Sequence, residues 1–362
     1  MTSLQDKITG ESCAGAPRSA GLKSLWSRGI DFFGCEYAIM GGAMSWVSER
    51  NLVAALSNAG AFGVIACSAM TPELLDKEIT ETKKLLTSPS HKGGGDKRSF
   101  GVNLIIMHPK MDELIEVCKK HYVSHVVLAG GIPKDSWIKA IKAYGAKVIC
   151  FAPSAIIARK LIRLGADAIV IEGMEAGGHI GPVSTSVLAQ EILPVIREVP
   201  VFVAGGIGRG EAMAAYLEMG ASGVQLGTRF VCATESIAHA KFKEAFIRAA
   251  ARDAQPSVQL DPDFPVIPVR AVVNKATDAF ARMQYEVIAE FRGGKIDKKE
   301  AQLKIEHFWA GALRRAVIDG DVEHGSVMAG QSVGMVIKIQ PLKEILEELI
   351  GQAEAYLDAH RS

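Results

Sequence analysis

The sequence has 362 residues, 48% of them hydrophobic and 22% charged, which is enough apolar material for one large α/β domain or for one domain with an appendage. The net charge of +1 gives no reason to expect nucleic acid or an acidic membrane surface as a partner. No apolar run approaches the ~20 residues of a transmembrane helix, and residues 1–30 lack the apolar core of a secretory signal. The six cysteines are scattered and show no metal-ligand spacing, so we expect a reduced, cytoplasmic protein without a metal site.

The chain begins with a polar segment, and we expect residues 1–34 to be a loosely held tail. From about residue 36 a unit recurs, in which a helical pattern ends in a pair of Gly and Ala and a short β-rich run follows. Gly145-Ala146 before Lys147–Phe151 is one example, and Gly165-Ala166 before Ala168–Glu172 is another. The glycine suits a left-handed helix C-cap, and the short connection then enters a buried strand. Repeated units of this kind predict parallel strands with helices outside them.

Eight strands are predicted in this way: Ala38–Met40, Phe62–Ala66, Phe100–Leu104, His125–Leu128, Lys147–Phe151, Ala168–Glu172, Val201–Ala204 and Gly223–Leu226. The predicted helices between them are 48–59, 72–86, 111–121, 134–143, 154–164, 186–198 and 209–219. This alternation predicts an α/β fold, the (β/α)8 TIM barrel. A doubly wound open sheet is the alternative, but it would need a glycine fingerprint after its first strand, where this chain has Gly41-Gly42-Ala43-Met44.

The rest of the chain is predicted to surround the barrel. Ser88–Lys97 is a polar insertion before the third strand, and we expect a mobile surface loop there. After the eighth strand, the pattern predicts a small, mainly helical region with an extended stretch at 253–268 and a second Gly-rich loop from Gly320 to Gln331. Its predicted helices are 237–252, 275–291 and 298–318, and a final amphipathic helix follows at 341–358. The predicted domains are the tail at 1–34, the barrel at 35–236, the helical substrate-side region at 237–340 and the C-terminal helix at 341–362.

The sixth predicted strand ends at Glu172, and a loop with four glycines and one histidine follows it, up to Pro182. Glycines let a backbone approach a flat or charged ligand closely, because they have no Cβ. His179 is the only side chain of this loop that titrates near neutral pH. The loop is therefore a candidate active-site loop, although a structural histidine among turn-forming glycines is the alternative interpretation.

The loops after the seventh and eighth strands are rich in glycine, and in TIM barrels phosphates commonly bind there. They read Ala204-Gly205-Gly206-Ile207-Gly208-Arg209-Gly210 and Gly227-Thr228-Arg229-Phe230. Both expose backbone N–H groups, and the first also begins a helix, where the dipole favours an anion. A dinucleotide fingerprint is disfavoured, because Glu211 stands where its third glycine should be. The two loops indicate a mononucleotide-like phosphate, and two tight turns are the structural alternative.

Two further polar residues lie at strand ends. The amide of Asn103 offers donors and an acceptor to the edge of a heterocycle, or it caps a turn. Glu172 is suited to a ribityl hydroxyl, or it is a buried carboxylate bonded to backbone. Together with the phosphate loops and the small residues of the first strand end, they indicate a flavin mononucleotide (FMN).

These motifs resemble the nitronate monooxygenase family, formerly called 2-nitropropane dioxygenase, whose superfamily also contains the flavin-type enoyl-acyl-carrier-protein reductases. The resemblance covers about residues 35–340. It rests on the loop Glu172–Gly181 and on Ala204–Ile207, Gly227–Phe230, Phe100–Asn103 and Gly325–Gln331. One motif departs from the family, which usually has Gln-Gly-Gly-Met where this chain has Gly41-Gly42-Ala43-Met44.

The resemblance implies a barrel that holds FMN non-covalently under a C-terminal region that covers the site. It implies that His179 is the catalytic acid/base residue. It implies cofactor contacts for Gly42, Ala43, Met44, Asn103, Glu172, Gly177, Gly178, Gly205, Gly206, Gly227, Thr228, Met328 and Gln331.

The predicted function is oxidation of alkyl nitronates with O2 by an FMN-dependent oxidoreductase. The alternative is reduction of an enoyl thioester, with NAD(P)H as reductant and acyl carrier protein as a candidate partner. The sequence of Gly325–Gln331 resembles the reductases more closely. A binding protein that has lost catalysis is a third interpretation, against which the intact glycine loops and His179 count. A dehydrogenase of the inosine-phosphate type is disfavoured, because it needs a nucleophilic cysteine in the loop that carries His179. The expected substrate is a small molecule, and a homodimer is left open.

Overall fold

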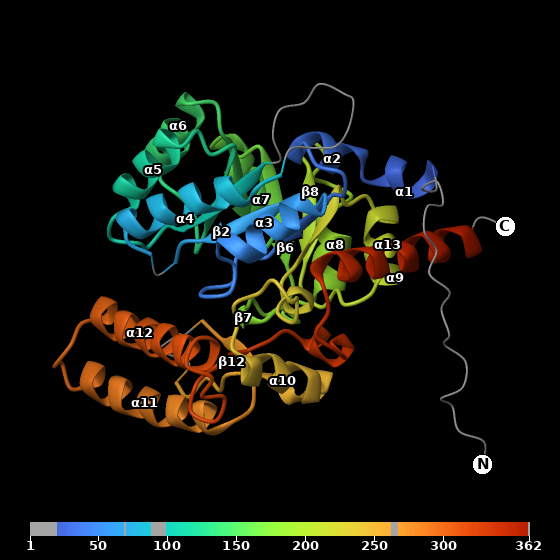
Figure 1. The fold of residues 1–362 in the computed structure, drawn as a ribbon. Coiled ribbons are helices and arrows are strands. Elements are labelled where there is room, and N and C mark those ends of the chain that lie inside the picture. The colour runs from blue at the N-terminus through green and yellow to red at the C-terminus, as the bar shows by residue number, and fades with distance from the viewer. Residues whose placement is uncertain (1–19, 69, 88–98, 262–266, 361–362) are drawn as a thin grey trace, which may run out of the picture.

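The computed structural model describes residues 20–68, 70–87, 99–261 and 267–360 (Figure 1). In this part of the chain, eight parallel strands form one sheet in the order β1-β9-β8-β6-β5-β4-β3-β2. The strands are β1 Ile39–Gly41, β2 Gly63–Ala66, β3 Phe100–Ile105, β4 His125–Ala129, β5 Lys147–Phe151, β6 Ala168–Glu172, β8 Val201–Ala204 and β9 Gly223–Leu226. A bridge between Met40 and Phe62 joins the two edges, so the sheet closes into the predicted barrel. The predicted loop Ser88–Lys97 lies outside the described residues.

Helices connect successive strands on the outside of the barrel. They are α3 Arg50–Asn58, α4 Pro72–Leu85, α5 Met111–Lys120, α6 Asp135–Ala143, α7 Ala155–Arg163, α8 Thr185–Ile192 and α9 Gly210–Glu218. Local signals set their ends. At the start of α7, Ser154 Oγ accepts a hydrogen bond from Ile157 N at 3.4 Å, and Gly165 follows its end with φ +106°. The helix predicted at 186–198 ends earlier, at Ile192, because Pro194 cannot continue an α-helix.

Residues 20–33 correct the prediction of a loosely held tail. They form α1 Ala20–Leu25 and α2 Ser27–Phe33, while residues 1–19 lie outside the described part. Phe33 is 1% exposed, and its ring centroid lies 4.2 Å from that of Phe62 and 4.6 Å from that of Phe202. Figure 1 shows α2 at the opposite end of the barrel from α11 and α12. The prediction failed because the partners of Phe33 are far away in the sequence.

A second, smaller sheet lies between the barrel and the helix pair of the C-terminal half (Figure 1). It contains β7 Gly178–His179, β10 Ala254–Pro256, β11 Val269–Val272 and β12 Val327–Met328. β11 is antiparallel to the other three. Residues 237–340, which we call the cap, also contain α10 Ala240–Arg248, α11 Lys275–Arg292, α12 Lys298–Val317 and the short 3-10 helices η2 Ala251–Asp253 and η3 Gln331–Met335. The sequence predicted the three helices but only an extended stretch in place of this sheet.

The last helix, α13 Leu342–Ala359, belongs to the barrel rather than to the cap. It packs against α9 and α3, which places it between the last and the first helix of the ring. Arg229, in the short 3-10 helix η1 Thr228–Phe230 after β9, donates to Glu348 Oε1 of α13 at 3.0 Å. The cap is therefore an insertion between the eighth strand and the eighth helix of the barrel.

Phe33→Ala tests whether α2 closes the barrel. Removing this buried ring leaves a cavity among Phe62, Phe202 and their neighbours, so we expect the free energy of unfolding to fall by about 3–5 kcal/mol. Urea unfolding measures it. The control is Tyr285→Ala on α11, where the side chain is 64% exposed and a change below about 0.5 kcal/mol is expected. Equal effects of the two substitutions would contradict this role of α2.

Candidate active site

The loop after β6 carries His179 to the cap, where its backbone becomes a strand. His179 is paired with Val269 of β11, and Ile180 N donates to Pro268 O at 2.9 Å. The side chain of His179 is exposed. The backbone of the cap therefore fixes the position of the predicted acid/base residue.

Gly177 brings this loop into direct backbone contact with the cap. A Cβ added at Gly177 would lie 2.6 Å from both Ala329 C and Gly330 N. Gln331 N donates to Glu175 O at 2.9 Å, and Gly330 N donates to Thr228 Oγ1 at 3.0 Å. The histidine loop, the cap and the loop after β9 thus meet at one point.

Met328 and Gly178 also lie together at this contact. Met328 is half-buried in β12, and its Sδ lies 3.7 Å from the position of a Cβ at Gly178. Gly178 has φ +78°, which favours glycine.

Glu175 and Thr185 join the histidine loop to the loop after β8, and the sequence analysis missed both. Glu175 Oε2 accepts from Thr185 N, and it lies 2.9 Å from the Thr185 hydroxyl. That hydroxyl also lies 3.0 Å from Gly205 O, and its single proton serves one acceptor at a time. The only sequence signal was a carboxylate within a glycine loop.

The predicted phosphate loops lie side by side at the rim of the barrel. Gly205 and Gly206 have φ values of +93° and +72°, where side chains other than glycine are strained. Within the described chain, no group accepts a hydrogen bond from the backbone N–H of Gly205, Gly206 or Gly227. Thr228 accepts the Gly330 N–H, and its own hydroxyl proton is still available to donate. These donors suit an anion.

The first strand end approaches the same rim. Gly42 N donates to Leu226 O at 2.8 Å, and a Cβ at Gly42 would lie 3.3 Å from Gly227 Cα. Ser48 holds the turn through Ala43 and Met44, because its hydroxyl donates to Gly42 O at 2.7 Å and accepts from Met44 N at 3.0 Å. The structure therefore places Gly42–Met44 beside Gly227.

Glu172 is the last residue of β6, and Asn103 lies inside β3, two residues before its end. Asn103 is 4% exposed, and its Nδ2 donates to Val127 O at 3.2 Å, which leaves its Oδ1 as an acceptor. Burial raises the pKa of Glu172 to about 7, against the opposing effect of His179 nearby. Gln225 of β9, which the sequence analysis missed, donates to Glu172 Oε2 over 3.5 Å. A carboxyl group with this pKa can exchange a proton near neutral pH.

Arg270 is a buried cation beneath the histidine loop and was also missed. It is 2% exposed and lies on β11, opposite Gly178. Its Nε donates to Met174 O at 2.9 Å, and its Nη1 donates to Ala254 O. Burial lowers its pKa, while Glu175 raises it. A guanidinium stays charged at neutral pH, so the loop lies over a fixed positive charge.

Among the described residues, no group of three or more His, Cys, Asp or Glu side chains is arranged to hold a metal ion. Nor does the described part of the chain contain a helix with the length and apolar character needed to cross a membrane.

Comparison with known proteins gives the family and, with it, the class of flavin-dependent oxidoreductases. The model of the nitronate monooxygenase family matches residues 27–352, and the chain belongs to this family. FabK from Thermotoga maritima has 36% identity and a TM-score of 0.79, over 92% of this chain and 98% of FabK.

Two curated relatives are similar over nearly their whole length. The first is the (3aS,4S,5R,7aS)-5-hydroxy-7a-methyl-1-oxo-octahydro-1H-indene-4-carboxyl-CoA dehydrogenase of Rhodococcus jostii (strain RHA1), with 27% identity over 93% of this chain and 98% of the relative. The second is the probable nitronate monooxygenase of Staphylococcus aureus (strain MRSA252), with 25% identity over 91% of this chain and 98% of the relative.

Gly177→Ala tests the backbone contact between loop and cap. A methyl group there would collide with main-chain atoms, so we expect a loss of about 1–3 kcal/mol in the free energy of unfolding, together with reduced activity. Gly181→Ala in the same loop is the matched control, because an added Cβ meets nothing within 4 Å. Urea unfolding of both variants measures the two changes in the free energy of unfolding. If both behave alike, the close approach at Gly177 does not constrain the site.

Glu172→Gln tests the raised pKa. Because the folded-state pKa lies above that of a free glutamate, the unfolded chain ionises first as the pH rises. Wild type should therefore lose stability relative to Glu172→Gln between about pH 5 and pH 8, by at most about 3 kcal/mol. Urea unfolding of cofactor-free protein at both pH values measures this, with Glu286→Gln on the exposed face of α11 as control. A stability difference that does not change with pH would argue against the raised pKa.

Proposed function

We propose that the protein is an FMN-dependent oxidoreductase that acts on the Cα–Cβ bond of an acyl thioester. The observation that carries this proposal is the amino-acid sequence of the segment that contacts the histidine loop. Ala329 and Gly330, which contact Gly177, belong to the segment Gly325–Gln331. The sequence of this segment resembles the flavin-type enoyl reductases more closely than the nitronate monooxygenases. The name of the Rhodococcus jostii relative gives a carboxyl-CoA compound as its substrate, which supports a CoA thioester as a candidate substrate here.

The residues at the rim fit FMN. The unbonded N–H groups of Gly205, Gly206 and Gly227 and the hydroxyl of Thr228 would hold its phosphate. Gly42 and Gly227 approach each other so closely that only small residues leave space for a flat ring beside them. Asn103 Oδ1 would accept from the edge of the ring, and Gly42–Met44, Glu172, Gly177, Gly178, Met328 and Gln331 would surround it. When bound, FMN supplies reversible transfer of a hydride.

His179 would hold the proton of the reaction. In reduction, its imidazole delivers a proton to Cα while a hydride reaches Cβ, and NAD(P)H supplies the electron pair. In the dehydrogenase direction, the same imidazole would take the proton from Cα, the hydride would leave Cβ, and NAD(P)+ would take up the electron pair. Arg270 and the β7–β11 pairing orient the loop that carries it. Glu172, with its pKa of about 7, would exchange protons with groups that contact the strand end.

Oxidation of alkyl nitronates with O2 is the second candidate. The family match and the Staphylococcus aureus relative favour it. It ranks second because the sequence identity to FabK, 36%, is higher than the 25% identity to the Staphylococcus aureus relative. The segment Gly325–Gln331 also resembles the reductases more closely.

The cofactor is tested first. Purified protein should be yellow and should release FMN on denaturation, because its glycine loops suit one phosphate group and lack the third glycine of a dinucleotide fingerprint. Chromatography of the released flavin identifies it. Release of FAD, or a colourless protein that takes up no flavin, would exclude FMN.

His179→Ala distinguishes the two substrate classes. Wild type should oxidise NAD(P)H in the presence of an enoyl thioester, and the variant should be about 10²–10⁴-fold slower, because a positioned proton donor is lost. Anaerobic bleaching of the flavin by NAD(P)H should be unchanged, and His360→Ala at the exposed end of α13 should behave as wild type. If wild type instead consumes O2 with a preformed nitronate and ignores the thioester, the second candidate replaces the first.

A further inference from the structure

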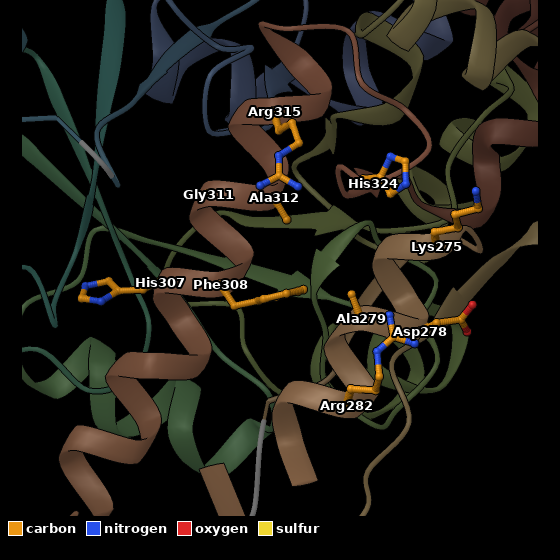
Figure 2. Close-up of a pocket in the computed structure, with 10 residues that line it drawn as sticks. All are labelled: Lys275, Asp278, Ala279, Arg282, His307, Phe308, Gly311, Ala312, Arg315 and His324. Carbon is orange, nitrogen blue, oxygen red and sulfur yellow. The ribbon is translucent and has the colours of Figure 1, made fainter. Parts of the chain in front are cut away.

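A cavity of about 670 Å³ lies between α11 and α12, away from the barrel rim. Among the described residues, the Lys, Arg, Asp and Glu side chains that line it are the cations Lys275, Arg282 and Arg315 and the carboxylate of Asp278 (Figure 2). Figure 2 shows Arg315, His324, Lys275 and Arg282 around the gap between the two helices. A cavity of this size suits a small ligand rather than a protein surface.

Two of these cations are not neutralised by the protein. Lys275 pairs with Glu323, but among the described residues neither Arg282 nor Arg315 has an ion pair. Neighbouring arginines of the same helices do have partners: Arg292 lies 2.6 Å from Asp261, and Arg314 lies 3.3 Å from Asp319. The cap thus leaves two guanidinium groups at the cavity with their donors available, and guanidinium groups match phosphate oxygens in geometry.

The cavity also has a surface for a flat ring. The half-buried Phe308 points between the helices (Figure 2). At Gly311, one turn along α12, a Cβ would meet nothing within 4 Å, so the helix backbone is open there. Aromatic side chains of this kind stack on nucleobases. Phosphate donors beside an aromatic ring indicate a nucleotide.

The course of the chain limits the distance between the cavity and His179. β11 is paired with His179 at Val269, and the chain then runs six residues on to Lys275 at the cavity. Six extended residues span at most about 20 Å. An arm of that length is therefore enough for a ligand that reacts at His179 to place its nucleotide in this cavity.

We propose that this cavity binds the phosphate-bearing adenosine end of an elongated substrate or cosubstrate. The shared chemistry is an adenosine bisphosphate. It can come from a CoA thioester, which has 3′- and 5′-phosphates, or from NADPH, which has 2′- and 5′-phosphates. The CoA source rests on the proposed function, whereas binding of an adenosine bisphosphate does not.

The test is calorimetric titration of the flavin-loaded protein with adenosine 3′,5′-bisphosphate and, separately, with adenosine 2′,5′-bisphosphate. Wild type should bind at least one of them saturably, and more weakly as salt is raised. The double variant Arg282→Gln/Arg315→Gln should bind about tenfold more weakly or worse. Both side chains are exposed, so the variant should fold, which circular dichroism checks. Arg314→Gln, beside Arg315 but paired with Asp319 and outside the cavity lining, is the matched control and should bind as wild type.

The outcomes separate the sources. Preference for the 3′,5′ compound supports CoA, and preference for the 2′,5′ compound supports NADPH. Absence of saturable binding of both, or equal loss in Arg314→Gln and the double variant, overturns the proposal. Because these nucleotides do not react, a protein that binds them but turns over no thioester contradicts only the proposed function. A protein that reduces thioesters but binds neither nucleotide contradicts only this inference.

Discussion

The candidate active site depends on one close approach between two stretches of backbone. Gly177 meets Ala329 and Gly330 at a distance that leaves no room for a Cβ. Gln331 N donates to Glu175 O, and Gly330 N donates to the side-chain hydroxyl of Thr228, beside this contact. Because most of these contacts are made by backbone, the fold itself sets the position of the His179 backbone relative to the glycine loops after β8 and β9.

The connectivity of the chain explains how this contact is maintained. The cap leaves the barrel after the eighth strand and returns at the eighth helix, so both of its ends are fixed to the same side of the barrel. Arg229, which is 4% exposed, bonds to Met335 O of the cap and to Glu348 of α13. The barrel contributes the glycine loops and strand ends, and the cap contributes the strand that pairs with His179. We therefore expect substrate preference to depend mainly on the cap.

The parts of the fold that were predicted from the sequence are those with local signals. Barrel strands such as Ala168–Glu172 follow a Gly-Ala pair, and helices such as α7 carry their own caps. The packing of Phe33 on Phe62 and Phe202 was not predicted, since it joins residues far apart in the chain. The small sheet was missed because its strands are short and pair over long distances. Arg270 and Gln225 each gave only a weak signal, a single polar residue in an apolar run.

The buried charge of Arg270 also bears on why one scaffold suits both candidate reactions. A nitronate is an anion stabilised by resonance, and removal of a proton from Cα of a thioester produces an enolate of the same kind. Arg270 is held beneath the loop by Met174 O and Ala254 O, so its charge does not need to reorganise when an anion forms. Burial makes this charge more effective than it would be in water. A fixed cation, together with His179 as the proposed acid/base residue, would therefore be compatible with both chemistries. On this proposal, the substrate that the cap admits would separate the two reactions.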